Sequence, residues 1–226
     1  MNSKAIILVS GGIDSATSLA IAKHDGYDCY ALTFDYGQRQ RIELRAAENV
    51  AQSIGVKEHR IFNLPIGQFG GSALTDTQID VPHHNHSHYN DIPITYVPAR
   101  NTIFLAVALG WAEALDAQHI FIGVSAVDSP DYPDCRPEYM QAFQAMADLA
   151  TKKVIEGGTI KIHTPLIQLD KAQTIKLGTS LGVDYSITVT CYKPTSEGEA
   201  CGQCTSCVLR MKGFQAAGIN DPTLYV

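Results

Sequence analysis

The sequence lacks several features that would place it in other classes of protein. No apolar run is long enough to span a membrane, and the first apolar stretch ends in a glycine turn rather than in a signal-peptide cleavage site. We therefore predict a cytoplasmic protein with no membrane partner. Positive charge is also scarce, since 17 lysines and arginines against 23 acidic residues give a formal charge of −6. Such a chain has no general field to attract a phosphate backbone, so we expect no direct nucleic-acid partner.

The composition and the order of apolar segments predict an α/β fold. The 226 residues, 45% of them hydrophobic and 18% charged, suffice for one sizeable core. Apolar runs rich in β-branched residues alternate with segments of helical period, which predicts a doubly wound, mainly parallel sheet covered by helices. We predict strands at residues 5–9, 29–34, 60–63, 119–124 and 161–163, and helices at residues 14–23, 39–54, 101–115, 137–155 and 171–181.

Composition divides the chain into two regions. Residues 1–185 carry the α/β pattern, and residues 186–226 form a C-terminal segment with four cysteines. Within the first region, residues 64–98 have no clear period and contain paired glycines and several prolines, so we expect a long loop or lid there. The run from His83 to His88 holds four histidines. We interpret it as a solvated polar loop rather than as a metal site.

A glycine loop, defined as residues 10–15 with the sequence SGGIDS, lies between the first predicted strand and a helix. Glycines permit positive φ and leave no Cβ in the way of an anion, so backbone N–H groups and the helix N-terminus favour a phosphate there. Ser10 and Ser15 can add hydroxyl donors. Asp14 would repel phosphate unless Mg²⁺ lay between them, so we expect Mg²⁺ with ATP. A simple helix cap is the alternative, but the whole string in this context is more restrictive.

Kinase chemistry is disfavoured by another absence. No GxxxxGK[ST] string occurs in the sequence, so the loop has no lysine to hold a transferring γ-phosphate.

Four of the six cysteines are crowded near the C-terminus in the pattern C-x9-C-x2-C-x2-C. Two-residue spacers let thiolates from a tight turn converge on one tetrahedral centre, and four thiolates leave no open position for water. We therefore predict one structural Zn²⁺, bound by Cys191, Cys201, Cys204 and Cys207. An iron–sulfur cluster is the alternative, but no cysteine follows Cys207 in the x3-C-P position of a ferredoxin run.

Several strings together resemble one family. They are LVSGGIDSAT, LTFDYGQRQRIEL, VPARN, YPDCRPE, TPL with LDKAQTIKLG, and TCY with CGQC-x-x-C. Along nearly its whole length the chain resembles the QueC family of queuosine biosynthesis, within the ATP-pyrophosphatase (adenine nucleotide alpha-hydrolase) superfamily. The family usually has glycine where this chain has Ala99.

The resemblance implies an ATP-dependent ligase that adenylates the carboxylate of 7-carboxy-7-deazaguanine, replaces AMP by ammonia, and activates the resulting amide with a second ATP to give a nitrile. It also implies a homodimer with one structural zinc per chain. Ser10, Asp14 and Ser15 carry over as catalytic residues. The residues carried over for ATP binding are Leu8, Val9, Ser10, Gly11, Gly12, Ile13, Asp14, Ser15, Ala16, Thr17 and Ser18.

Other polar residues within the matching strings are candidates for the deazaguanine and the nucleotide. Arg100 and Arg136 are fork-shaped donors for a carboxylate or phosphate, and Asp134 or Glu138 can accept from the amino edge of the ring. A surface ion pair or a helix cap is the alternative for each of these four. Asp35, Tyr36 and Arg39 follow the second predicted strand and are candidates for the border of the adenine or ribose site.

Two other functions compete with this interpretation. A tRNA-modifying adenylating enzyme of the thiolation type uses a similar loop, but it generally needs an RNA-binding surface and reactive cysteines, and only Cys29 and Cys135 lie outside the metal cluster. The second alternative is a zinc module that binds nucleic acid. The segment around the cysteines mixes basic with acidic residues and shows no basic stripe.

Overall fold

The computed structural model describes residues 2–39, 41–84 and 92–226, and its centre is one parallel sheet. Five strands lie in the order β3-β2-β1-β4-β5. They are β1 (Lys4–Leu8), β2 (Asp28–Asp35), β3 (Glu58–Asn63), β4 (His119–Phe121) and β5 (Lys161–His163). Ile6 in the central strand lies opposite Tyr30 on one side and Ile120 on the other. The predicted parallel α/β fold is confirmed.

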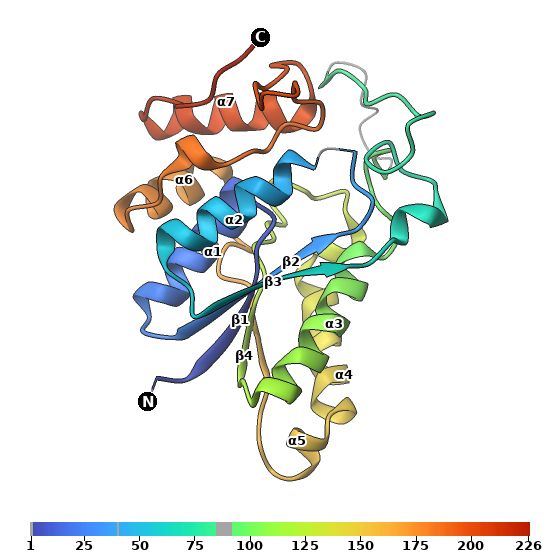
Figure 1. Ribbon diagram of the computed structural model, residues 1–226, viewed down its shortest axis with the longest axis vertical. Coiled ribbons are helices and arrows are strands. Elements are labelled where there is room, and N and C mark those ends of the chain that lie inside the picture. Colours follow the sequence, from blue (N-terminus) through green and yellow to red (C-terminus); the bar gives the residue numbers. More distant parts are fainter. Residues whose placement is uncertain (1, 40, 85–91) are drawn as a thin grey trace.

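Helices cover both faces of this sheet (Figure 1). One face carries α1 (Ile13–His24) and α2 (Ile42–Ile54), with α6 (Lys171–Ser180) packed on α1 and α7 (Thr205–Ala217) packed on α6. The other face carries α3 (Arg100–Leu115) and α4 (Pro137–Ala150), which is followed by the short α5 (Lys152–Ile155). Short 3₁₀ helices lie in the connections, among them Ile66–Phe69, Pro133–Cys135 and Tyr185–Ile187.

The side-chain alternation of β1 explains the two layers. Ile6 and Leu8 belong to the core under α3 and α4, whereas Ala5, Ile7 and Val9 belong to the core under α1 and α2. Successive strand residues point to opposite faces, so a continuous apolar run is what a strand buried on both sides requires.

Some predicted element boundaries were wrong. The helix predicted at residues 137–155 is interrupted at Thr151, whose φ of −113° and ψ of 142° are extended. The strand predicted to reach residue 124 ends at Phe121, and the helix predicted from residue 39 begins at Ile42. No prediction was made for α7, because its buried face includes Cys207, Arg210 and Gly213 and so has no apolar stripe.

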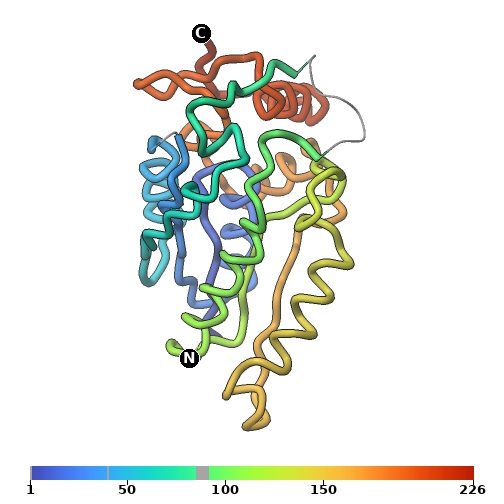
Figure 2. Tube along the Cα trace, turned by 90° about the vertical axis from the view of Figure 1, so that its right-hand side faces the viewer, coloured from blue at the N-terminus to red at the C-terminus, as the bar shows by residue number. Residues whose placement is uncertain are grey.

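The segment predicted as a long loop or lid, residues 64–98, contains one short 3₁₀ helix and turns within its described part. Its end reaches the cysteine segment, where His83 forms an antiparallel bridge with Cys204 and the His84 N–H donates to the Gln203 carbonyl at 3.0 Å. Figure 2 shows this approach at the end of the molecule where the C-terminus lies. His86 and His88 of the predicted polar loop lie outside the described residues.

Within the described ranges, no helix combines the length and the hydrophobicity needed to cross a bilayer.

Candidate functional site

A cavity of about 280 Å³ opens beyond the carboxyl ends of β1, β2 and β4. The strand order reverses between β1 and β4, which is where parallel α/β sheets place their ligands. Seven predicted nucleotide residues line it, namely Leu8, Val9, Ser10, Gly12, Ile13, Asp14 and Ser15. Among its other lining residues are Phe34, Tyr36, Glu43, Arg100, Phe104, Val189 and Tyr192.

The two glycines of the glycine loop have different structural roles. Gly11 has a φ of +84°, and a Cβ there would lie 2.7 Å from both the Ala47 nitrogen and the Glu43 carbonyl oxygen. Gly12 has an ordinary φ of −91°, and a Cβ there would meet nothing closer than 3.5 Å. The prediction that the glycines turn the chain with positive φ therefore holds for Gly11 alone. Gly12 is the N-cap of α1 and gives no side-chain cap, which leaves the first-turn N–H groups for another acceptor.

The two serines of the loop hold each other. The Ser15 hydroxyl accepts from the Ser10 N–H and the Ser10 hydroxyl, both at 3.1 Å, and donates to the Gly12 carbonyl. These bonds fix the shape of the loop, so both serines have a positioning function before any ligand binds.

Gly11 and the end of the predicted nucleotide stretch lie behind the cavity. Ala16, Thr17 and Ser18 are fully buried and do not contribute to the lining. The Thr17 hydroxyl lies 2.7 Å from the Tyr185 hydroxyl, which ties α1 to the Tyr185–Ile187 turn. These three residues therefore support the loop from behind the cavity, and their assignment to the nucleotide site stays a prediction.

Asp14 is held by a lysine that was not predicted as a site residue. Lys171, at the start of α6, donates to both carboxylate oxygens of Asp14 at 2.6 and 2.7 Å, and its ammonium lies 3.1 Å from Asp128. Asp170 and Gln173 form a capping box that fixes this helix end. Lys171 lies 157 positions from Asp14 in the sequence, so nothing local indicates this contact. Its place in the string LDKAQTIKLG, which resembles the family, is the one feature of the sequence that pointed to it.

The charge balance of this cluster favours an ionised lysine. Burial lowers the pKa of Lys171, but Asp14 and Asp128 outweigh this effect and the net pKa is raised. Burial raises the pKa of Asp128 despite the neighbouring ammonium. Lys171 therefore already neutralises part of the charge with which Asp14 would repel a phosphate.

A third glycine that sequence analysis missed supports the same loop. A Cβ at Gly123, just beyond β4, would lie 2.6 Å from the Asp14 carbonyl oxygen and 3.0 Å from the Ser15 nitrogen. Glycine is required here for close packing, so β4 can approach the first turn of α1.

Of the four residues predicted for the deazaguanine, the structure brings only Arg100 to the cavity. Asp134 is 4% exposed, and its carboxylate accepts from the Asn101 N–H at 3.0 Å, which caps the start of α3. Arg136 and Glu138 are exposed and lie outside the lining. For Asp134 the geometry corresponds to the helix-cap alternative.

Of the three predicted residues at and after the end of β2, only one lines the cavity. Tyr36 lines the cavity, and its hydroxyl interacts with Arg100. Asp35 pairs instead with the exposed Arg41 at 2.8 Å. Arg39 donates to the carbonyls of Asp76 and Ile79, so it anchors the 64–98 segment.

Both cysteines outside the cluster are buried thiols. Burial raises the pKa of Cys29 to about 11 and that of Cys135 to about 12. A reactive sulfur carrier needs thiolate character, which these environments oppose.

The four clustered cysteines form a closed site. Their sulfur atoms all lie within 4.8 Å of one another, and those of Cys201 and Cys207 are 3.9 Å apart. A tetrahedron with bonds of about 2.3 Å to zinc has edges of about 3.8 Å. Backbone N–H groups of Lys193 and Cys201 donate to the Cys191 sulfur at 3.3 Å. The arrangement therefore fits a single tetrahedral metal ion.

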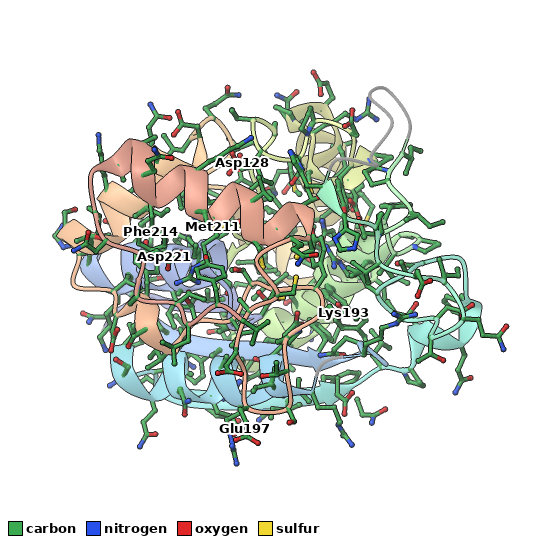
Figure 3. All side chains as sticks on the ribbon, turned by 90° about the horizontal axis from the view of Figure 1, so that it is seen from above. Asp128, Lys193, Glu197, Met211, Phe214 and Asp221 are labelled. Carbon is green, nitrogen blue, oxygen red and sulfur yellow. The ribbon has the colours of Figure 1, made fainter. Side chains whose placement is uncertain are left out.

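A covering segment, residues 189–192, joins this cysteine site to the cavity. The Val189 N–H donates to the Gly11 carbonyl at 2.9 Å, and the Ser206 hydroxyl donates to the Thr190 carbonyl at 2.6 Å. Val189, Thr190 and Tyr192 line the cavity, while Cys191 between them belongs to the metal site. Seen from above, α7 crosses the upper end of the molecule, and the loop with Lys193 and Glu197 extends from it toward α2 (Figure 3).

Comparison with known proteins gives one consistent family. The chain is 61% identical over 223 residues to the 7-cyano-7-deazaguanine synthase of Coxiella burnetii, covering 99% of this chain and 98% of that protein. It is 60% identical over 222 residues to the synthase of the same name from Cellvibrio japonicus, with 98% and 97% covered. The NMN synthetase structure from Francisella tularensis has a TM-score of 0.53 at 19% identity, covers 97% of this chain and 79% of its own, and shows the shared fold. Residues 4–218 match the family described as queuosine biosynthesis protein QueC, and the chain belongs to this family.

Proposed function

We propose that the protein is an ATP-dependent carbon–nitrogen ligase that converts 7-carboxy-7-deazaguanine and ammonia into 7-cyano-7-deazaguanine. The observation that carries this proposal is the identity of about 60% to synthases of that name over nearly the whole chain. We assign this activity to the cavity at the glycine loop.

The chemistry consists of two rounds of activation. A carboxylate oxygen attacks the α-phosphorus of ATP, pyrophosphate leaves, and ammonia then displaces AMP to give the amide. In the second round the amide oxygen attacks a second α-phosphorus, and loss of AMP leaves the nitrile. Each round needs the same event at phosphorus, so one loop can serve both by orientation and electrostatic stabilisation.

The glycine loop is our candidate for binding the departing pyrophosphate. Its first-turn N–H groups lack a side-chain cap, and Ser10 and Ser15 add hydroxyl groups at the cavity wall. Lys171 supplies a fixed positive charge next to Asp14, and we assign it to the same phosphate site. Arg100 is our candidate for the substrate carboxylate or the α-phosphate, because it is the guanidinium among the lining residues of the described chain.

Two metal ions complete the proposal. Asp14 is the residue that would hold Mg²⁺ with ATP, which supplies charge neutralisation for the polyphosphate when bound. Cys191, Cys201, Cys204 and Cys207 would hold one structural Zn²⁺, since four sulfur ligands leave no open position for chemistry. Metal analysis of the purified protein distinguishes zinc from an iron–sulfur cluster. A colourless protein agrees with zinc, and a coloured one with the cluster.

The direct test is incubation with ATP, Mg²⁺, ammonium and the carboxy-deazaguanine, followed by mass detection of products. The expected products are the nitrile, with two AMP and two pyrophosphate for each molecule formed. Formation of ADP, or no consumption of the carboxylate, contradicts the proposal. The homodimer implied by the family resemblance stays a prediction, which sedimentation at several protein concentrations tests.

A further inference from the structure

A glutamate beside the glycine loop is not part of the Asp14 cluster. Glu43 lies in the first turn of α2 and lines the cavity, and the close approach of its carbonyl to Gly11 places it next to the loop. Asp14 and Glu43 are the two acidic residues of the cavity lining in the described chain. Both oxygens of Asp14 accept from Lys171, whereas no ion pair within the described ranges involves Glu43.

The groups that face Glu43 come from three other parts of the fold. Arg100 at the start of α3 and Tyr36 after β2 are close enough to interact with it electrostatically. Glu43 is half-buried, and it shares the lining of a small recess with Arg39 after β2 and with Tyr192 of the covering segment. Burial raises the pKa of Glu43 to about 7, and the charge of Arg100 offsets this only in part. A carboxyl with this pKa can both accept and release protons near neutral pH.

The reaction requires such a group at defined steps. Adenylation of a carboxylate releases no proton. Every later step does, because a nitrile nitrogen carries no hydrogen and all three hydrogens of ammonia must leave as protons. One is lost as ammonia displaces AMP, one as the amide oxygen attacks phosphorus, and one as the C–O bond to AMP breaks. Lys171 is an ionised donor and Asp14 is held by it, so neither is suited to accept these protons.

We propose that the Glu43 carboxylate is the general base that removes N–H protons from the amide and from its adenylated form. This inference rests on the proposed function. In the first of these steps the amide oxygen bonds to the α-phosphorus, the bond to pyrophosphate breaks, and Glu43 takes one N–H proton. In the second, the C–O bond breaks, the nitrile π bond forms from the N–H electron pair, AMP leaves, and the proton passes to Glu43, which returns each proton to solvent.

The test separates the two kinds of step with one variant. Glu43→Gln keeps the size of the side chain but cannot accept a proton. With the carboxylate substrate and no ammonia, ATP–pyrophosphate exchange should stay within about threefold of the unmodified protein, because that step moves no proton. With 7-amido-7-deazaguanine as substrate, nitrile formation should fall by about 100-fold or more, the usual contribution of a general base.

Matched controls keep the result interpretable. Glu48→Gln changes an exposed glutamate on the same helix and should leave both rates unchanged. Glu43→Asp retains a carboxyl and should recover part of the nitrile rate. For the unmodified protein, the rate from the amide should rise with pH through about 7 and then level, because the base must be ionised. Glu43→Gln should lose this dependence.

Three outcomes would overturn the inference. Nitrile formation by Glu43→Gln at the unmodified rate removes the residue from proton transfer. Equal loss of pyrophosphate exchange and nitrile formation assigns it to nucleotide binding instead. If raising the pH above 7 restores the rate of nitrile formation by Glu43→Gln, another group is the base. If the unmodified protein makes no AMP or nitrile at all, the proposed function itself has failed.

Discussion

The glycine loop and the cysteine site are built in different ways, although they lie side by side. The loop is six consecutive residues held by the sheet behind it and by contacts at Gly11 and Gly123. The cysteine site gathers Cys191 and the later cysteines from different turns, and their mutual distances suit a metal ion. The loop therefore takes its shape from the fold, whereas we expect the C-terminal segment to depend on a bound metal ion for its shape.

The difference predicts how a metal ion at the cysteines would affect the cavity. Residues 189–192 carry a cavity wall on one side and a metal ligand on the other, and Val189 bonds to Gly11. A change at the cysteines should therefore reach the nucleotide through the covering segment, while a change in the loop should leave the metal in place.

Loss of a bound metal ion should remove the largest single contribution to the stability of the C-terminal segment. Structural zinc in small metal-dependent domains contributes about 10–16 kcal/mol of apparent binding free energy. Cys191→Ser should lose the metal and weaken ATP binding at least about tenfold, or 1.4 kcal/mol, while circular dichroism still shows the sheet and its helices. Cys29→Ser, a buried cysteine away from the site, should keep both. Stoichiometric zinc and unchanged ATP affinity in Cys191→Ser would contradict the proposed coupling between the cysteine site and ATP binding.

Gly11→Ala should cost about 2–5 kcal/mol of unfolding free energy, from a left-handed backbone and from overpacking against α2. The neighbouring Gly12→Ala has an ordinary φ and only van der Waals contacts, so it should change stability by less than about 1 kcal/mol. Urea denaturation of the two variants measures the contrast. Equal losses would contradict the different roles assigned to the two glycines. Metal content should be unchanged in both.

Lys171→Gln should reduce nitrile formation by about 100- to 1,000-fold, the usual effect of removing a preorganised group that stabilises developing charge. The loss should appear in pyrophosphate exchange as well as in the later steps, unlike that of Glu43→Gln. Lys176→Gln, at an exposed position on the same helix, is the matched control and should have normal rates. Normal pyrophosphate exchange in Lys171→Gln would remove that lysine from the phosphate site.

Ala99→Gly should have the smallest effect, and it should stabilise the protein. Ala99 has a φ of 53° at the N-cap of α3, a conformation that costs alanine about 1–2 kcal/mol, so glycine should raise stability by about 0.5–1 kcal/mol. The same substitution at the exposed Ala106 in the middle of α3 should lower stability by about 1 kcal/mol. Thermal unfolding measures whether each variant is more or less stable than the unmodified protein. A loss of stability in Ala99→Gly would contradict the strain assigned to Ala99.

Sequence analysis was reliable where a signal is local. The strands β1, β2 and β4 follow from apolar runs and the glycine loop from one contiguous string, whereas the predicted bounds of β3 had to be placed in the more polar segment EHRIFN. The roles of Lys171 and Glu43 could not be predicted from the sequence, because they depend on contacts between elements that are far apart in the chain. Taken alone, each is an ordinary charged residue near the start of a helix. We predicted Asp134, Arg136 and Glu138 as site residues because they lie in a string shared with the family. In the structure, Asp134 instead accepts a hydrogen bond at the start of α3, and the other two side chains are exposed.

The hydrogen bond from Val189 to Gly11 has a consequence for how the protein is made. The ribosome synthesises the glycine loop long before the covering segment and the last cysteine, which follow position 188. A nascent chain can therefore assemble most of its sheet before it has a finished nucleotide site. A chain that terminates between the end of β5 and Cys207 has all five strands but no complete cysteine site, so we expect it not to turn over ATP.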